Sequence, residues 1–231
     1  MRSVTCGRIV GSVLLAWACV ASAQGLPSAA GAVGSGAAGP TAGTAYVERF
    51  DGTDPATVFE GLLTVGHDGP WTGTLTGEHY RLENRSTPGA VRYFYLTSLP
   101  GGGAPSQGAI HVTVSIDEVH PGAFVVGAGI VFDVDPDRGH YLAFVATDAG
   151  YALYVRGADG LDEAVSGTLD AFAPGGRNRL TVRTAGSETT LEINGEFVAG
   201  IDFGRPPSGG VGILALGAGT FAFSDLVVEA P

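Results

Sequence analysis

The amino-acid sequence predicts an all-β protein made of antiparallel strands. Residues 110–116 alternate between apolar and polar side chains, which is typical of a strand with one buried and one exposed face. Short runs of Gly, Pro, Asp and Asn, the residue types that turns favour, separate this stretch from other apolar stretches. No part of the sequence shows the period of an amphipathic helix. Together these observations favour an antiparallel β-sandwich.

The clearest strands lie within residues 127–155. The sequences DPDRG (135–139) and DAG (148–150) interrupt this segment. Both are turn sequences, because Pro presets φ, Asp caps its own backbone and Gly accepts a positive φ. The segment is therefore predicted to form three strands joined by two tight connections.

The lengths of these two loops decide which residues face each other. We expect five residues in the first loop and three in the second, with Gly150 in the left-handed conformation. The expected cross-strand pairs are Ile130–Phe144, Phe132–Leu142, Val145–Leu153 and Thr147–Tyr151. The bulky face, assigned to the core, holds Ile130, Phe132, Leu142, Phe144 and Tyr154. The less bulky face, which a curved sheet would leave concave and open, holds Val131, Asp133, Tyr141, Ala143, Val145 and Leu153, with Tyr151 one step along.

The first 23 residues have the features of a secretory signal peptide. Arg2 and Arg8 flank the start of an apolar run at 9–20, and the sequence ASA at 21–23 matches a small-x-small cleavage site. The run is too short for a membrane span, so we expect a secreted or periplasmic protein without a transmembrane segment after cleavage. Lipid attachment at Cys19 is disfavoured, because the preceding Ala-Trp-Ala matches a lipidation site poorly.

The remaining chain is predicted to be a tether followed by one domain. Residues 24–44 contain Gly, Ala, Ser, Pro and Thr without charge or aromatic rings, a composition that cannot offset the entropy of ordering. Residues 45–231 suit one β-sandwich domain. Both cysteines precede residue 24, which excludes disulfides and thiolate metal sites from the domain. The net charge of −11 argues against nucleic acid as a partner.

The other strands follow from the same rules. Before the central segment we expect strands at 46–50, 79–85, 91–97 and 108–119, with an irregular stretch up to Gly77 that contains Trp71. After it we expect a loop-like stretch to Gly176 and strands at 178–185, 188–193, 211–216 and 220–228. A two-residue turn at Gly186-Ser187 pairs Leu180 with Ile193 and Val182 with Leu191, all facing inward. The last strand carries Phe221, Phe223, Leu226 and Val228.

The turn at Asn194-Gly195 admits two loop lengths. A two-residue loop would bring Glu196 onto the core face beside Ile193, and burying a lone carboxylate is costly. We therefore expect a three-residue loop, which places Ile193 opposite Phe197.

These elements, in this order, resemble the concanavalin A-like jelly-roll domains of bacterial extracellular proteins. That superfamily includes laminin-G-like modules, legume lectins and family 16 glucanases. The resemblance covers about residues 45–229 and is carried by GAGIVF (127–132), DPD (135–137) before YLAF (141–144), NRLTV (178–182), LEING (191–195) and FSDL (223–226). It implies two curved antiparallel sheets without implying one activity, since the fold hosts hydrolases, lectins and passive spacers.

Two patterns of acidic residues bear on metal binding and on catalysis. Asp133, Asp135 and Asp137 alternate as in calcium loops, but Arg138 stands where a helix-flanked calcium loop has Gly, and Asp-Pro-Asp is also turn chemistry. The expectation is therefore a turn and no cofactor, with calcium as the alternative. The related glucanases carry Glu-x-Asp-x-x-Glu or Glu-x-Asp-x-Glu on one strand, and neither pattern occurs here, so no catalytic residue is assigned.

Aromatic rings beside polar groups favour carbohydrate as the ligand. Tyr93 and Tyr95 share one face of a strand, Asp133 is expected opposite Tyr141, and Tyr151 is expected on the same face. Tyrosines that merely fill the second face of a sandwich are the alternative for each ring. The predicted function is a secreted, lectin-like, non-catalytic module that binds a glycan or another cell-envelope component. A glycoside-acting hydrolase, related to keto-disaccharide hydrolase domains, and a structural envelope module are the alternatives.

Overall fold

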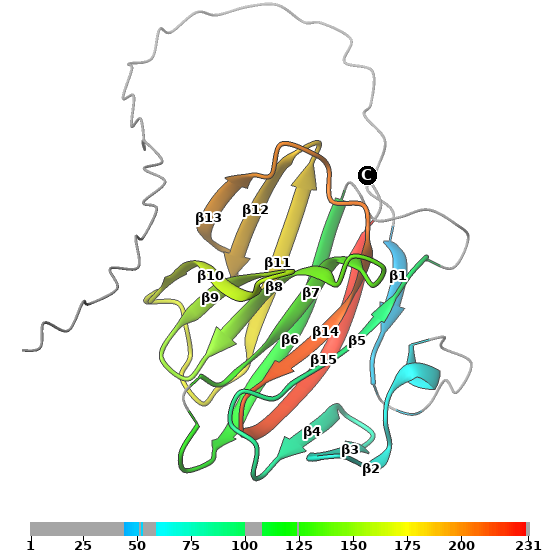
Figure 1. Ribbon diagram of the computed structural model, residues 1–231, viewed down its shortest axis with the longest axis vertical. Coiled ribbons are helices and arrows are strands. Elements are labelled where there is room, and N and C mark those ends of the chain that lie inside the picture. The colour runs from blue at the N-terminus through cyan, green and yellow to red at the C-terminus, as the bar shows by residue number, and fades with distance from the viewer. Residues whose placement is uncertain (1–43, 51, 53–58, 100–107, 124, 230–231) are drawn as a thin grey trace, which may run out of the picture. The chain divides into compact units, whose positions relative to one another are not determined.

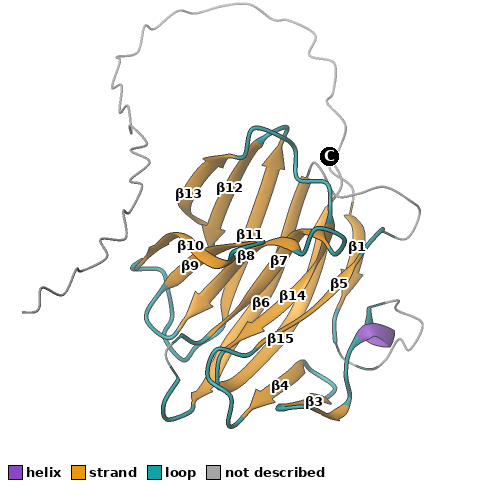
Figure 2. Cartoon of the chain, in the orientation of Figure 1, coloured by secondary structure: helices purple, strands orange, loops and turns teal. Residues whose placement is uncertain are grey.

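Two antiparallel sheets, stacked as two layers of strands, make up the fold (Figure 1). The computed structural model describes residues 44–50, 52, 59–99, 108–123 and 125–229. Strands and their turns account for nearly all of these residues, with one short 3-10 helix, η1 (Glu60–Leu62) (Figure 2). The predicted all-β, antiparallel sandwich is therefore confirmed.

The larger sheet has nine strands in the order β13-β12-β11-β6-β15-β4-β3-β2, and β1 extends it by pairing with β15. Its strands are β1 (Thr44–Glu48), β2 (Gly66–Asp68), β3 (Trp71–Leu75), β4 (Tyr80–Asn84), β6 (Gly108–Val119), β11 (Asn178–Ala185), β12 (Glu188–Ile193), β13 (Glu196–Asp202) and β15 (Gly219–Glu229).

The smaller sheet has six strands in the order β10-β9-β8-β7-β14-β5. They are β5 (Val91–Leu96), β7 (Gly127–Asp135), β8 (His140–Thr147), β9 (Tyr151–Gly157), β10 (Gly160–Gly167) and β14 (Gly210–Leu216). The central segment of the sequence supplies three neighbouring strands of this sheet, β7, β8 and β9. One face of the sheet packs on the core, and the other carries the candidate site.

One apolar core fills the space between the sheets. Phe132 and Phe144 reach it from the six-stranded sheet and Phe221 and Phe223 from the nine-stranded sheet, and all four are fully buried. The expected pairs Ile130–Phe144, Phe132–Leu142, Leu180–Ile193 and Val182–Leu191 are all present. On β15, Asp225 adopts a left-handed φ of 56° inside a register shift, which lets Leu226 rejoin the core face.

The expected loop between β8 and β9 is wrong by one residue. Ala146 pairs with Tyr151, so Val145 faces Ala152 rather than Leu153. Gly150 does not have a positive φ. It is instead required because a Cβ there would overlap the carbonyl of Gly167 on β10. The shift moves every later side chain of β9 to the opposite face, so Leu153 enters the core and Tyr154 leaves it.

The expected three-residue turn between β12 and β13 is also wrong. Asn194 and Gly195 both have positive φ, of 54° and 86°, and Ile193 pairs with Glu196 across a two-residue turn. Glu196 nevertheless stays exposed, because it lies at the end of β13, an edge strand. Phe197 is 65% exposed on the same strand.

Two stretches expected to be irregular contain strands. β2 and β3 lie in the stretch before Gly77, and Trp71 opens β3 and packs against Phe221 at a ring distance of 6.3 Å. β10 lies in the stretch before Gly176, and its sequence GLDEAVSG has too few apolar residues to show a strand pattern.

The expected signal peptide (1–23) and the tether up to residue 43 lie outside the described residues. Within the part that the structure describes, no helix has the length and apolar character needed to cross a membrane.

Candidate functional site

Four of the seven tyrosines line the face of the six-stranded sheet that points away from the core. We name this surface the tyrosine face and define it by Tyr93 and Tyr95 on β5, Tyr141 on β8 and Tyr154 on β9. The ring centroids of Tyr93 and Tyr95 are 5.8 Å apart, and those of Tyr93 and Tyr141 are 5.1 Å apart. The rings are tilted by 32° and 46° to each other, so three of them form one continuous aromatic surface.

The four rings differ in how far solvent reaches them. Tyr93 is 38% exposed and Tyr95 is half-buried, whereas Tyr141 and Tyr154 are only 6% and 8% exposed. The two buried rings pack in a second apolar cluster with Val131, Val134, Ala143, Val145, Ala152, Leu214 and Leu216. Tyr93 is therefore the ring that a ligand could cover, and Tyr141 supports it from the side.

Burial also sets the ionisation of the supporting tyrosines. Burial raises the pKa of Tyr141, and the nearby charge of Arg156 opposes that shift only in part. Burial likewise raises the pKa of Tyr154, and the charge of Glu163 adds to the shift. Both phenols therefore keep their protons at neutral pH and can donate as well as accept hydrogen bonds.

A hollow of about 420 Å³ adjoins the tyrosine face along β5. We call it the β5 hollow, and its lining residues are Leu62, Tyr93, Phe94, Tyr95, Leu96, Thr97 and Ser98. β5 ends the order of the described six-stranded sheet, so one side of its backbone has no strand beside it within that sheet. Such a hollow combines an aromatic ring with hydroxyl and backbone polar groups, a combination that suits a polar ligand with apolar ring faces.

Asp133 lies at the end of β7 but does not project from the tyrosine face as expected. The register shifts between Phe132 and Asp135, so two residues oppose Tyr141 instead of one. Asp133 takes a left-handed φ of 52°, and Val134 occupies the position on the tyrosine-face side. The expectation that the Asp133 side chain accompanies Tyr141 on an open face is therefore wrong.

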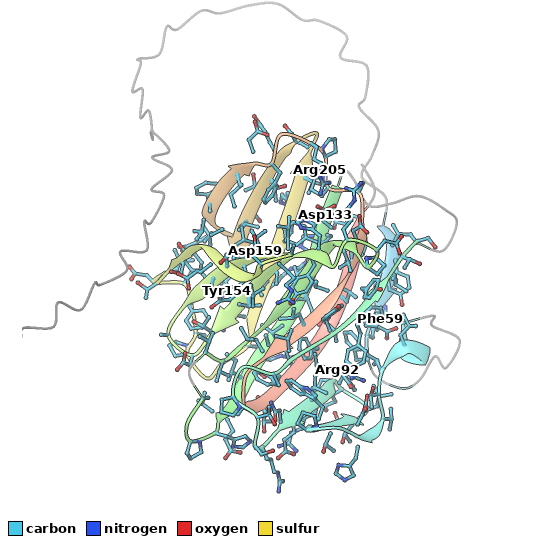
Figure 3. All side chains as sticks on the ribbon, viewed as in Figure 1. Phe59, Arg92, Asp133, Tyr154, Asp159 and Arg205 are labelled. Carbon is cyan, nitrogen blue, oxygen red and sulfur yellow. The ribbon has the colours of Figure 1, made fainter. Side chains whose placement is uncertain are left out.

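The carboxylate of Asp133 instead holds two loops together. It is 5% exposed and accepts hydrogen bonds from Arg205 Nη1 at 3.2 Å and Nη2 at 2.5 Å. The backbone nitrogens of Ser208 and Gly209 donate to it at 2.9 and 3.2 Å, and His140 Nε2 lies 3.3 Å away. Figure 3 shows Asp133 and Arg205 side by side.

These contacts determine the ionisation of Asp133. Burial is the largest single influence and would raise the pKa of Asp133. The hydrogen bonds from Arg205, Ser208 and Gly209, together with the charge of Arg205, outweigh burial and hold the pKa below its usual value. The carboxylate therefore stays ionised, and its oxygens already have partners within the protein.

Tyr151 lies on the core side of its strand, not on the tyrosine face. Its ring packs against Phe144 at 6.5 Å, and its hydroxyl group lies against Gly167. Tyr154 takes the place that was expected for Tyr151. The exchange follows from the loop length, because the loop before Tyr151 has four residues instead of the expected three.

The three alternating aspartates fit a calcium ion poorly. Asp133 is engaged as described, and Asp135 Oδ1 accepts a hydrogen bond from the Arg138 backbone nitrogen at 3.1 Å, which is turn chemistry. Among the described residues, no group of three His, Cys, Asp or Glu side chains is arranged to hold a metal ion.

Several solved structures share this fold at low sequence identity. The carbohydrate-binding module CBM66 from Bacillus subtilis has a TM-score of 0.53 and 10% identity, covering 71% of this chain and 92% of that chain. A GlcNAcα1-4Gal releasing endo-β-galactosidase from Clostridium perfringens has a TM-score of 0.58 and 10% identity, covering 84% of this chain and 64% of that chain. A β-glucanase from Bacillus licheniformis has a TM-score of 0.51 and 10% identity, covering 82% of this chain and 99% of that chain.

These likenesses confirm the expected concanavalin A-like jelly roll, and at such identities they show the fold alone. No family model matches the sequence, and no curated protein matches it.

Proposed function

We propose that this protein is a secreted, non-catalytic module that binds carbohydrate on the tyrosine face, with a sugar ring stacked on Tyr93. The observation that carries the proposal is the partly exposed Tyr93 ring, fixed between Tyr95 and Tyr141 at centroid distances of 5.8 and 5.1 Å. A ring held by its neighbours loses little freedom when a ligand covers it, so more of the contact energy appears as affinity.

The surroundings of Tyr93 supply the polar groups that a sugar also needs. Thr97 and Ser98 line the β5 hollow beside the ring, and their hydroxyl groups can donate and accept. The CBM66 module, the endo-β-galactosidase and the β-glucanase are similar in fold, and each is named for carbohydrate. This agreement supports a glycan rather than another class of ligand.

The state of the Asp133 carboxylate supports binding without catalysis. A glycosidase needs a carboxylic acid whose pKa is raised, together with a second carboxylate across the sugar. The pKa of Asp133 is lowered rather than raised. Asp133, the carboxylate that the sequence placed opposite Tyr141, is already engaged by Arg205 and two backbone amides.

A glycan array followed by calorimetry on the best ligand tests this proposal. Tyr93→Ala should weaken binding at least about fivefold, because an aromatic stack and its polar surroundings are worth on the order of 1 kcal/mol or more. The matched control is Phe197→Ala, which removes a 65% exposed ring from β13 of the other sheet and should leave affinity unchanged.

Equal losses in the two variants would point to a surface other than the tyrosine face. Release of reducing sugar from the bound glycan, abolished by a single Asp or Glu substitution, would establish a hydrolase instead.

A further inference from the structure

A second hollow, of about 360 Å³ and more polar than the β5 hollow, lies at the Asp133 end of the six-stranded sheet. We call it the arginine hollow and define it by Thr97, Asp135, Arg138, Arg205 and Ser208. These residues come from the end of β5, the β7–β8 hairpin and the connection between β13 and β14. Three segments that are distant in sequence therefore converge on one small volume.

The arginine hollow adjoins the proposed sugar site. Thr97 lines both this hollow and the β5 hollow. Val134, also in its lining, belongs to the apolar cluster of Tyr141, and the Tyr95 ring lies against Gly210 at its edge. A sugar stacked on Tyr93 would therefore have its neighbouring unit close to the arginines.

The hollow is held in shape before any ligand arrives. Asp133, buried beneath it, fixes the Arg205 guanidinium by a two-point ion pair and the loop backbone through Ser208 and Gly209. A non-glycine residue with a positive φ, as Asp133 has, is a strained feature of the kind that clusters at ligand sites. An arginine oriented in this way binds without the entropy cost of first being ordered.

The groups left free in the hollow both donate and accept. The Arg205 side chain is 49% exposed, and its contacts with Asp133 and the Pro206 carbonyl leave Nε–H and one Nη2 N–H for a ligand. The Arg138 side chain is 81% exposed, and its Nε lies 3.5 Å from Asp135 Oδ2. Asp135 also accepts a hydrogen bond from the Arg138 backbone nitrogen, and its 35% exposed carboxylate keeps lone pairs that can accept from a ligand. Two arginines and the two aspartates, Asp133 and Asp135, balance in formal charge. This mixture matches sugar hydroxyl groups, which donate and accept, better than it matches an anion.

We propose that the arginine hollow is a specificity subsite for adjacent hydroxyl groups of an uncharged sugar, next to the sugar stacked on Tyr93. This inference rests on the proposed function. A uronic acid or a sulfated sugar would meet the Asp135 carboxylate and the net charge of −11 of the chain, and both oppose its binding.

Affinity electrophoresis of the full chain tests the inference with named probes. The neutral polysaccharides are mixed-linkage β-glucan, arabinoxylan, galactan and levan, and the acidic ones are polygalacturonate and alginate. We expect retardation by at least one neutral polysaccharide and none by the acidic ones. Arg205→Ala should weaken that binding about tenfold, as expected for the loss of hydrogen bonds from a charged group. Arg138→Ala should weaken it severalfold and leave the melting temperature unchanged, because the Arg138 side chain is exposed.

The matched control is Arg183→Ala, because Arg183 is also 49% exposed and ion-paired but lies on β11 of the other sheet. It should bind as the parent protein does. If Arg138→Ala and Arg205→Ala also bind normally while Tyr93→Ala fails, the subsite is excluded and the sugar site stands. Tighter retardation by an acidic polysaccharide overturns the chemistry assigned to the hollow, and no retardation by any probe contradicts both proposals.

Discussion

Asp133 and Arg205, 72 positions apart in the chain, form a two-point ion pair that joins the β7–β8 hairpin to the connection before β14. The Asp133 side chain is 6% exposed and the Arg205 side chain is 49% exposed, so the acid is buried beneath the base. Removing the acid would leave Arg205 and the Ser208 and Gly209 amides without their shared acceptor. This one contact therefore shapes the end of the sheet where the two hollows meet.

The first prediction concerns the stability that this contact provides. Asp133→Ala should lower the free energy of unfolding by about 2–4 kcal/mol, because it leaves several donors unsatisfied and places Ala at a positive φ. Asp133→Asn is the matched control and should cost less, since Asn tolerates the same backbone conformation and still accepts hydrogen bonds. Urea denaturation measures both, and equal losses would show that the backbone conformation has no part in the effect.

The second prediction concerns the loss of stability at low pH. The folded-state pKa of Asp133 lies below the ordinary value of about 3.9. The ionised Asp133 therefore contributes its full stabilisation at pH values above about 3.9, and this stabilisation is lost as the pH falls through the lowered pKa. Urea midpoints between about pH 5 and pH 2 should therefore fall less steeply for Asp133→Asn than for the parent protein. Parallel pH profiles would contradict the assigned ionisation of Asp133.

The third prediction separates the supporting ring from the accessible one. Tyr141 is 6% exposed, so Tyr141→Ala should cost about 2–4 kcal/mol of unfolding free energy through the cavity it leaves. Tyr93→Ala should cost less than about 1 kcal/mol, because a 38% exposed ring leaves no closed cavity. The sequence places Tyr141 on a face expected to be open, where its loss would spare the fold, and the burial of the ring reverses that expectation.

Phe132→Ala provides the reference for a core cavity, at about 3–5 kcal/mol. Thermal melts of Phe132→Ala, Tyr141→Ala and Tyr93→Ala rank the three variants by their loss of stability. A stable Tyr141→Ala protein beside an unfolded Tyr93→Ala protein would mean that the exposures of the two rings are reversed.

Much of the fold followed from the sequence because strand pairing obeys local rules. The pairs Phe132–Leu142 and Leu180–Ile193 came from turn chemistry and alternation alone. The β8–β9 register failed because it depends on β10, which shows no apolar pattern. Gly150 is glycine to make room for the Gly167 carbonyl, not to adopt a positive φ.

The candidate site was predictable only in part, for related reasons. Tyr93, Tyr95 and Tyr141 share a surface as expected, and the register error exchanged Tyr151 for Tyr154. Asp133 was misplaced because a bulge inserts one residue opposite Tyr141. Its partner Arg205 lies in a loop, and no pattern in the sequence connects residues so far apart.

The fourth prediction concerns processing, which follows from the sequence. The ASA sequence at 21–23 should direct cleavage before Gln24. Mass spectrometry of the exported protein should therefore give a mature start at Gln24. A start at Cys19 carrying lipid would show a membrane-anchored protein instead.

The most direct test of the proposed function is to map a bound oligosaccharide onto the surface by NMR. A 15N-labelled protein titrated with an oligosaccharide of the polysaccharide selected above should show its largest shifts at the amides of Tyr93, Tyr95, Thr97 and Ser98. Amides of the opposite sheet, such as Arg183 and Phe197, should stay unmoved. Shifts confined to the nine-stranded sheet, or none near β5 at saturating ligand, would contradict binding on the tyrosine face.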